Sequence, residues 1–215
     1  MAGARQARPE PLSDHHRPEG QADRAAKEDI RTMRLATLTL LATGLTTGLA
    51  AGAMPATAQA AELSATLHEI STQGIGAAIG TVTITETAAG ASLAVDLHGL
   101  APGEHGFHVH ATGDCGPAAN AEGQVMAGQA AGGHWDPAGT KAHQGPEGHG
   151  HLGDLPVLTV AADGTAKATL VAPNIKDLGQ LAGKALMIHA GGDNYSDQPK
   201  PLGGGGARIA CGVLE

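Results

Sequence analysis

The sequence predicts an all-β domain of eight short antiparallel strands, arranged as a barrel or sandwich with two long functional loops. Short runs of alternating apolar and polar residues predict the strands, because successive side chains of a strand point to opposite faces. Glycine and proline interrupt these runs at intervals typical of antiparallel sandwiches and barrels. Two glycine-rich stretches without alternation predict the loops, and loops of this length in a compact domain are usually functional.

The predicted strands follow one another from residue 61 onward. In chain order they occupy residues 63–67, 80–86, 93–97, 106–110, 156–160, 166–171, 184–189 and 207–214. Asp163-Gly164 predicts a hairpin turn between the fifth and sixth strands, and residues 174–181 favour a short helical turn. The stretches without strands are residues 111–154, called the long loop below, and residues 190–206, called the second loop.

The composition limits both the core and the partners. Phe107, Trp135 and Tyr195 are the only aromatic residues, so Val, Leu, Ile and Ala must form the core. Apolar residues make up 41% of the chain, which is not typical of a disordered protein. The net charge of −8 argues against nucleic acid as a partner, because no basic run is available to neutralise phosphates.

The first sixty residues divide into two segments. Residues 1–32 are polar, charged and without periodicity, and we expect a disordered extension or a start assigned upstream of the true one at Met33. Residues 33–60 have a basic start, an apolar middle and an Ala-Gln-Ala ending, which predicts a secretory signal peptide. A membrane-spanning helix is the alternative; the cleavage site and the lack of a basic segment after it favour cleavage. The mature domain would span residues 61–215, without a stable membrane anchor.

Cys115 and Cys211 are the only cysteines. They suit one disulfide in an oxidising compartment or two unrelated thiols in the cytosol. The predicted export favours the disulfide and a periplasmic or secreted protein. A bridge over so long a stretch of chain is worth about 4–5 kcal/mol in the chain-entropy model.

Two histidines alternate with apolar residues on the fourth predicted strand. Phe107 and Val109 would face one side, and His108 and His110 the other. On its own, this pattern favours an ordinary strand with its histidines in solvent. The long loop and the seventh strand add further candidate ligands, namely His134, His143, His149, His151, Asp154 and His189. Imidazole and carboxylate groups are typical ligands of zinc and copper, whereas calcium and magnesium prefer oxygen, so the sequence predicts a site for zinc or copper.

Six short motifs carry a family resemblance. They are Gly-Phe-His-Val-His at 106–110, Gly-Gly-His at 132–134, Lys-Ala-His-Gln-Gly-Pro at 141–146, His-Leu-Gly-Asp-Leu-Pro at 151–156, Met-Ile-His at 187–189 and Gly-Ala-Arg-Ile-Ala-Cys-Gly-Val at 206–213. In this order they resemble copper,zinc superoxide dismutase of the bacterial secreted type, over nearly all of residues 61–215. The resemblance implies a Greek-key arrangement of the strands. It also implies an oxidoreductase acting on superoxide, with one copper and one zinc per chain.

The resemblance assigns a role to each candidate ligand. Copper would be bound by His108, His110, His134 and His189, and zinc by His134, His143, His151 and Asp154. His134 would bridge the metals and exchange a proton during turnover. Asp193 would join His108 to His143. Arg208 would orient the anionic substrate beside copper, so His134 and Arg208 are the expected catalytic residues.

The implied reaction converts superoxide to dioxygen and hydrogen peroxide, with a redox-cycling copper and a histidine-bridged structural zinc. It would protect the cell envelope against superoxide. Two other functions stay open, and an observation distinguishes each of them from an enzyme. A metal buffer or delivery protein of the same fold would bind metal without turnover, and a structural sandwich domain would not need the ligand set. The scarcity of large apolar residues favours a monomer over a homodimer.

The remaining histidines and basic residues have simpler interpretations. By resemblance, His105 would tie loops together through hydrogen bonds. We expect solvent or packing positions for His68, His98 and His149. Trp135 would cap the long loop or form an exposed contact patch. Lys141 and Lys200 are expected at the surface, where they are weak candidates for guiding the substrate.

Overall fold

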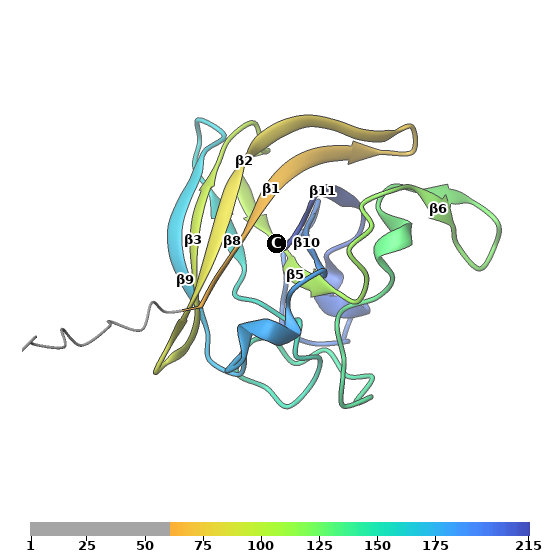
Figure 1. Ribbon diagram of the computed structural model, residues 1–215. Helices are drawn as coiled ribbons and strands as arrows, with labels where there is room; N and C mark the ends of the chain where they lie inside the picture. The colour runs from red at the N-terminus through yellow and green to blue at the C-terminus, as the bar shows by residue number, and fades with distance from the viewer. Residues whose placement is uncertain (1–60) are drawn as a thin grey trace, which may run out of the picture. The chain divides into compact units, whose positions relative to one another are not determined.

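The computed structural model describes residues 61–215 (Figure 1). The predicted extension at 1–32 and the predicted signal peptide at 33–60 lie outside the described residues. The boundary at residue 61 therefore stays a prediction. Within the described part of the chain, none of the helices has the length and apolar character needed to cross a membrane.

Antiparallel strands form nearly all of the regular structure. The strands are β1 (Glu62–Ser71), β2 (Gly74–Thr87), β3 (Gly90–Leu97), β4 (Gly103–His105), β5 (Phe107–His110), β6 (Ala118–Ala119), β7 (Val125–Met126), β8 (Leu158–Val160), β9 (Ala166–Ala172), β10 (Ala185–His189) and β11 (Arg208–Val213). Three short 3₁₀ turns accompany them, η1 (Gln129–Ala131), η2 (Leu178–Gln180) and η3 (Leu202–Gly204). The all-β prediction is confirmed.

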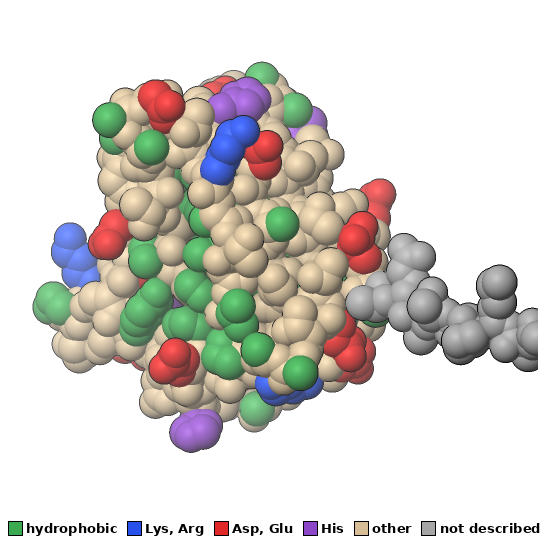
Figure 2. Space-filling view, turned by 90° about the vertical axis from the view of Figure 1, so that its left-hand side faces the viewer, with side chains coloured by type: hydrophobic (Ala, Val, Ile, Leu, Met, Phe, Trp, Pro, Cys, Tyr) green, Lys and Arg blue, Asp and Glu red, His purple; other side chains and the backbone are tan. Residues whose placement is uncertain are grey.

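Seven strands form one curled sheet in the order β5-β10-β11-β1-β2-β3-β9. Figure 1 shows this sheet bending round from β9 and β3 to β10 and β5. β9 pairs with β3, and β11 pairs with β1, although the members of each pair are far apart in sequence. The connections therefore cross over, as a Greek key requires. The face in Figure 2 carries scattered acidic side chains and few basic ones, in keeping with the net charge of −8.

The core is aliphatic, as the composition predicts. Along β2 the side chains of Val82 and Ile84 are fully buried, and on β3 Leu93 and Leu97 are too. The polar residues between them are less buried, because neighbours on a strand face opposite sides. Each such aliphatic side chain contributes about 1.5–3 kcal/mol by leaving water. Phe107 on β5 is also fully buried and closes this core beneath the histidines.

The fourth predicted strand, residues 106–110, is confirmed as β5, and a separate short strand, β4, precedes it across Gly106. β4 pairs with β8, whereas β5 pairs with β10. At the break, the Gly106 amide donates to the Gly191 carbonyl (2.7 Å) and the Gly106 carbonyl accepts from the His189 amide (2.8 Å). The chain thus changes sheets here, and the change brings β5 beside β10, the strand that carries His189.

The hairpin predicted across Asp163-Gly164 is wrong in its pairing. The turn is present, with the Ala161 amide donating to the Thr165 carbonyl (2.8 Å). However, β8 pairs with β4 and β9 pairs with β3, because the chain turns the corner between two sheets at this point. The predicted helical turn at 174–181 is confirmed as η2, where the Asp177 side chain caps the Gly179 amide.

The long loop contains more structure than its sequence predicts. The strands β6 and β7 pair within it as a small hairpin, with Ala118 opposite Met126. A disulfide joins Cys115 in this loop to Cys211 on β11, which confirms the predicted bridge. The loop is therefore fixed to the sheet near its start, and its later half passes over β5.

Candidate metal centre

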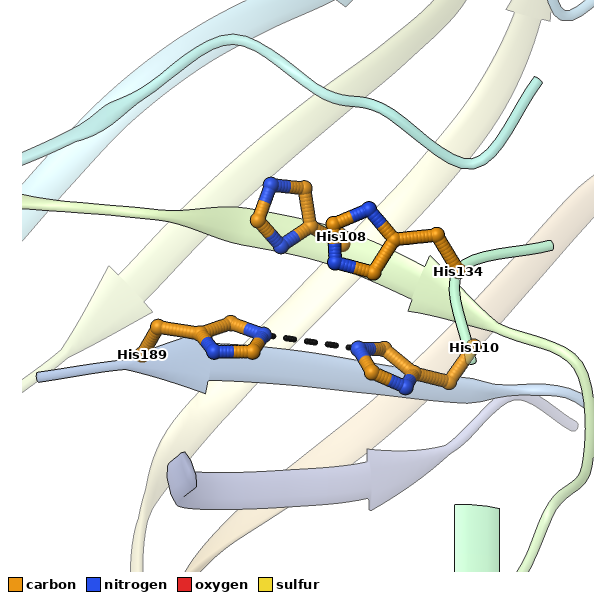
Figure 3. A group of neighbouring side chains, drawn as sticks. All are labelled: His108, His110, His134 and His189. Atoms are coloured by element: carbon orange, nitrogen blue, oxygen red, sulfur yellow. Dashed lines mark hydrogen bonds between the residues drawn. The ribbon is translucent and has the colours of Figure 1, made fainter. Parts of the chain in front are cut away.

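Four buried histidines converge beside the end of the sheet. His108 and His110 lie on β5, His189 ends the neighbouring strand β10, and His134 comes from the long loop. An isolated bridge joins His134 to His110 across the strand edge. One ligand atom from each of the four lies within 4.8 Å of every other (Figure 3). We call these four residues the copper group. The alternative of solvent-facing histidines on β5 is wrong, since both are fully buried.

Two of these rings direct lone pairs at each other. The Nδ1 atom of His110 lies 2.9 Å from the Gly132 carbonyl, and Nδ1 of His189 lies 3.2 Å from the Gly206 carbonyl. A carbonyl only accepts, so each Nδ1 carries the proton and each neutral ring has its lone pair on Nε2. These two Nε2 atoms are 3.4 Å apart (Figure 3). Two lone pairs facing each other need a cation between them, which is the chemistry of a metal site.

Burial keeps these rings neutral. It lowers the pKa of His108 to about 3, against the opposing hydrogen bond from Asp193. It lowers the pKa of His189 to about 4 and that of His110 well below the ordinary value for histidine. Neutral imidazole is the form that binds metals. Near pH 7 the copper group therefore presents free lone pairs without first losing protons.

A second group surrounds Asp154, which is buried. Its Oδ1 atom lies 2.9 Å from Nδ1 of His134, and its Oδ2 atom lies 2.9 Å from Nδ1 of His143. His151 is more distant, with its Nδ1 3.4 Å from Oδ1 of Asp154. We call His134, His143, His151 and Asp154 the zinc group. Burial opposes the charge of Asp154, but its close contacts with His134 and His143 outweigh burial and hold the carboxyl pKa well below its usual range.

Asp193 in the second loop joins the two groups. Its Oδ2 atom accepts from Nε2 of His108 (2.8 Å), and its Oδ1 atom accepts from Nε2 of His143 (2.7 Å). Both rings are fully buried at these contacts. Each Nε2 thus carries a proton, which leaves Nδ1 of each ring as the free ligand atom. These are the two contacts that the resemblance implies for Asp193.

Unpartnered nitrogen atoms provide an independent sign that the two groups bind metals. Four buried ring nitrogens have no hydrogen bond of acceptable geometry, namely Nδ1 of His108, Nε2 of His134, Nδ1 of His143 and Nδ1 of His151. A buried polar atom without a partner costs about 1–3 kcal/mol. The donor set contains only imidazole and carboxylate, which suits zinc and copper. The residues present therefore fit both metals.

The distances also associate His108 with the zinc group. One ligand atom each of His108, His134, His143 and Asp154 lies within 4.8 Å of the others, and His151 is outside this limit. The cause is the stacking of His108 on His134, whose ring centroids are 3.9 Å apart. His151 still has a buried Nδ1 without a partner, directed towards Asp154. The two groups are therefore adjacent and share His134.

Arg208 lines a pocket that opens onto the copper group. The pocket has a volume of about 340 Å³ and includes His110, His134 and His189 in its wall. The guanidinium of Arg208 donates to the Gly128 carbonyl (2.5 Å) and to the Gly132 carbonyl (2.6 Å). Two hydrogen bonds in fork geometry fix the orientation of the charge. Among the described residues lining this pocket, Arg208 is the only Lys or Arg, and none is acidic.

The other singled-out residues lie around the site. His105 is buried, with its ring nitrogens 2.7 Å from the His189 carbonyl and 2.8 Å from the Ala101 carbonyl, so it does connect two segments. Trp135 is 8% exposed and lies under Lys184, whose ammonium is 5.0 Å from the ring. An exposed Trp135 patch is therefore wrong, because the side chain is folded into the core beside the loop.

The remaining predicted surface positions agree with expectation. His98 and His149 are exposed, and His68 is half-buried with its ring near the Gly76 carbonyl (3.1 Å). Lys141 and Lys200 are exposed and are not part of the pocket wall beside the copper group.

Sequence reasoning missed two residues of the second loop, Tyr195 and Asp197. The Tyr195 hydroxyl accepts from the Val157 amide (2.9 Å), and Oδ2 of Asp197 accepts from the His143 amide (2.9 Å). Together with Asp193 they form a series with spacing of two. The spacing is not a strand signal, because the segment is not extended and Tyr195 has a positive φ of 57°.

The fold and the site define a β-barrel with two adjacent groups of buried metal-ligand side chains, both of which include His134. The family described as Copper/zinc superoxide dismutase (SODC) matches residues 78–214. The superoxide dismutase [Cu-Zn] of Escherichia coli strain K12 is 55% identical over 158 residues, which are 74% of this chain and 91% of that protein. The chain belongs to the copper/zinc superoxide dismutase family.

Solved structures agree with this assignment. The Cu/Zn superoxide dismutase from Brucella abortus has a TM-score of 0.70 and 48% identity, over 72% of this chain and all of that one. The monomeric copper, zinc superoxide dismutase from Salmonella enterica has a TM-score of 0.65 and 55% identity, over the same shares. The protein is a superoxide dismutase, an oxidoreductase that uses copper and zinc and acts on superoxide.

Proposed function

We propose that the copper group holds the catalytic copper and that the zinc group holds a structural zinc. The two nitrogens of His134 carry this proposal. Nδ1 lies 2.9 Å from Asp154 in the zinc group, while Nε2 is buried and has no hydrogen-bond partner. His110 lies beside the ring, with centroids 5.1 Å apart. His134 is therefore placed to serve one metal with each nitrogen.

His108 and His151 divide between the groups by their free nitrogens. Nε2 of His108 is committed to Asp193, so the ring offers only Nδ1. With His108 in the copper group, three imidazoles and one carboxylate remain for zinc once His151 is included. That is a closed four-ligand set, as structural zinc prefers. Buried Nδ1 atoms on His143 and His151 support this division.

Dismutation of superoxide requires one electron transfer in each direction and two protons for the peroxide formed. When bound, copper would accept and return the electron, and zinc would supply a positive charge beside His134. His134 contributes to the proton requirement, because it forms part of the pocket wall and its Nε2 atom has no hydrogen-bond partner and can hold a proton. Asp154 keeps the ring in place while this occurs, since its Oδ1 atom is 2.9 Å from Nδ1.

Arg208 provides the binding site for the anion. Its fork is held by the carbonyls of Gly128 and Gly132, so the charge stays at the copper side of the pocket. The Gly132 carbonyl also accepts from Nδ1 of His110. The same carbonyl thereby fixes the guanidinium of Arg208 relative to the ring of His110. In a protein of net charge −8, this local cation attracts a small anion where the overall charge repels it.

We further propose that residues 33–60 are a signal peptide, that residues 61–215 form the mature domain, and that the protein protects the cell envelope. The Cys115–Cys211 disulfide supports an oxidising compartment. Cell fractionation tests this proposal: the mature chain, beginning at residue 61, is expected in the periplasm or medium. Recovery of the uncleaved chain from the cytosol would contradict it. The monomeric Salmonella enterica relative supports a monomer, which sedimentation would check.

Metal analysis and turnover test the central proposal together. Purified protein is expected to contain one copper and one zinc per chain and to dismutate superoxide. His189→Ala removes a copper-group ring that is absent from the zinc group, so activity should fall at least about 10³-fold while zinc stays bound. Full activity in this variant would reject the ligand assignment. Bound copper without turnover in the wild-type protein would instead indicate a metal buffer of the same fold.

A further inference from the structure

Three side chains of the second loop reach across to the long loop and the segment that follows it. Asp193 contacts the ring of His143, and the Tyr195 ring packs on Gly145. Asp197 accepts from the His143 amide through Oδ2 (2.9 Å). The second loop thus forms two hydrogen bonds with His143, one to its ring and one to its backbone amide.

The other carboxylate oxygen of Asp197 binds a different segment. Its Oδ1 atom accepts from the Leu202 amide (3.2 Å), at the start of η3. Leu202 forms part of the wall of the pocket that opens onto the copper group. A single carboxylate therefore holds the backbone of a zinc-group residue and the backbone of a pocket-wall residue.

The segment between these contacts is held as one unit. The Asn194 amide donates to the Gly203 carbonyl (3.1 Å), and the Gly203 amide donates to the Ser196 carbonyl (3.0 Å). A shift of the long loop at His143 would act through Asp197 on a segment that includes Leu202. The pocket wall thereby depends on the zinc group, although Leu202 is not a ligand.

We propose that Asp197 is a positioning residue that holds His143 for zinc and couples the zinc group to the wall of the copper pocket at Leu202. The inference rests on the proposed function, because it takes His143 as a zinc ligand. It adds a role for a residue whose carboxylate accepts from two backbone amides. Both carboxylate oxygens are needed, since each accepts from a different backbone amide.

Asp197→Asn tests the proposal, because the amide keeps the shape but has a single acceptor oxygen. In the fully metal-loaded protein we expect zinc release to a chromogenic chelator to become about 10–100-fold faster, the range for residues that orient metal ligands. KM for superoxide should change by more than kcat, because the pocket wall moves while the copper ligands stay. Those two results together support the coupling.

Asp136→Asn is the matched control. Asp136 is also an aspartate that accepts from a backbone amide of the long loop, that of Lys141 (2.8 Å), but it contacts no ligand. Its zinc release and KM are expected to stay within about twofold of wild type. Equal effects of both variants would overturn the proposal, since any capping aspartate would then suffice. The proposal would also be overturned if Asp197→Asn released zinc at the same rate as the wild-type protein.

Amide hydrogen exchange in the wild-type protein gives a second measurement that does not depend on a variant folding. Removal of zinc should speed exchange at the His143 and Leu202 amides together, while the Lys141 amide changes little. Unchanged exchange at Leu202 would contradict the coupling. If the wild-type protein holds no zinc, the proposed function itself fails. Zinc held by the wild type and equally well by Asp197→Asn rejects only the role of Asp197.

Discussion

The copper group and the zinc group are adjacent but are held by different means. Three of the four copper-group histidines lie on β5 and β10, which pair with each other through the sheet. The zinc group lies wholly on the long loop, and side chains from the second loop hold it. Backbone pairing therefore positions most of the copper ligands, whereas the zinc ligands depend on contacts between loops.

The two groups also differ in the acceptors that their rings meet. His110 and His189 face carbonyls, and burial lowers the pKa of each. For His143, burial opposes the charge, but the nearby carboxylates of Asp154 and Asp193 outweigh burial and raise the pKa to about 9. Metal uptake at the zinc group must displace a proton from His143, while the copper group is already deprotonated at neutral pH.

Removing the disulfide should have the largest effect on the difference between the two groups, because the disulfide fixes the long loop to the sheet. Replacing Cys115 and Cys211 together by serine should lower the free energy of unfolding by about 2–5 kcal/mol, measured by urea denaturation. The zinc content should fall more than the copper content. Equal loss of both metals would show that the copper group depends on the loop as much as the zinc group does.

Opposite pH dependence of the two groups is the next largest effect. The folded metal-free protein binds protons at His108 and His189 only near pH 3 and 4, whereas unfolded histidines do so near 6.5. The unfolded chain thus binds more protons, and stability should fall by about 2 kcal/mol from pH 6 to pH 5. Denaturation at both pH values checks this.

For His143 the sign is reversed. Its folded-state pKa of about 9 exceeds the unfolded value, so its contribution is complete below pH 6.5 and is lost as the pH rises towards 9. His143→Gln should flatten the alkaline side of the profile of the metal-free protein and leave the acid side unchanged. An unchanged alkaline side would contradict the contrast between the groups.

Asp193→Asn should affect both groups at once, since Asp193 contacts His108 and His143. The amide group presents its oxygen to one ring only, and the other ring loses the acceptor that fixes its orientation. We expect zinc affinity to fall about 10–100-fold, with a smaller loss for copper, because β5 still holds His108. Competition with a chelator measures both affinities. An equal fall for both metals would show that strand pairing does not protect the copper group.

Arg208→Ala should give the smallest effect, confined to the substrate. Loss of the fixed cation is expected to lower kcat/KM about tenfold and to weaken its dependence on ionic strength, with copper still bound. Arg208→Lys should retain part of that dependence, because it keeps the charge but not the fork that binds the two carbonyls. Stopped-flow dismutation at several salt concentrations distinguishes the variants, and identical salt dependence in all three proteins would reject a guiding role.

Much of the fold could be predicted because strand alternation is a local signal. Val82 and Ile84, and Leu93 and Leu97, face the core as their spacing predicts. The extension of β2 back to Gly74 could not be predicted, since the segment from Gly74 to Gly80 has no alternation and pairs through its backbone with β1. The pairing of β8 with β4 is likewise set by a distant partner.

The site divides in the same manner. The alternating strands indicate the histidines of β5 and β10, and the clustered histidines of the long loop indicate the other candidate ligands. Motif resemblance supplied their division between the two metals and the role of Asp193. The contact of Asp197 with His143 spans 54 residues and joins a side chain to a backbone amide, so no local pattern reports it. The position of Trp135 also depends on tertiary packing, which buries its side chain in the core rather than leaving it at the surface.

Gly203 sets a limit on how this protein can be redesigned. A Cβ atom at this position would overlap Oδ1 of Asp193 and come within 2.8 Å of Nε2 of His143, and the backbone already has a positive φ of 69°. No side chain can be introduced here without breaking the link between the metals. A change of metal preference is therefore better sought at His151, whose side chain is 10% exposed, than at Gly203.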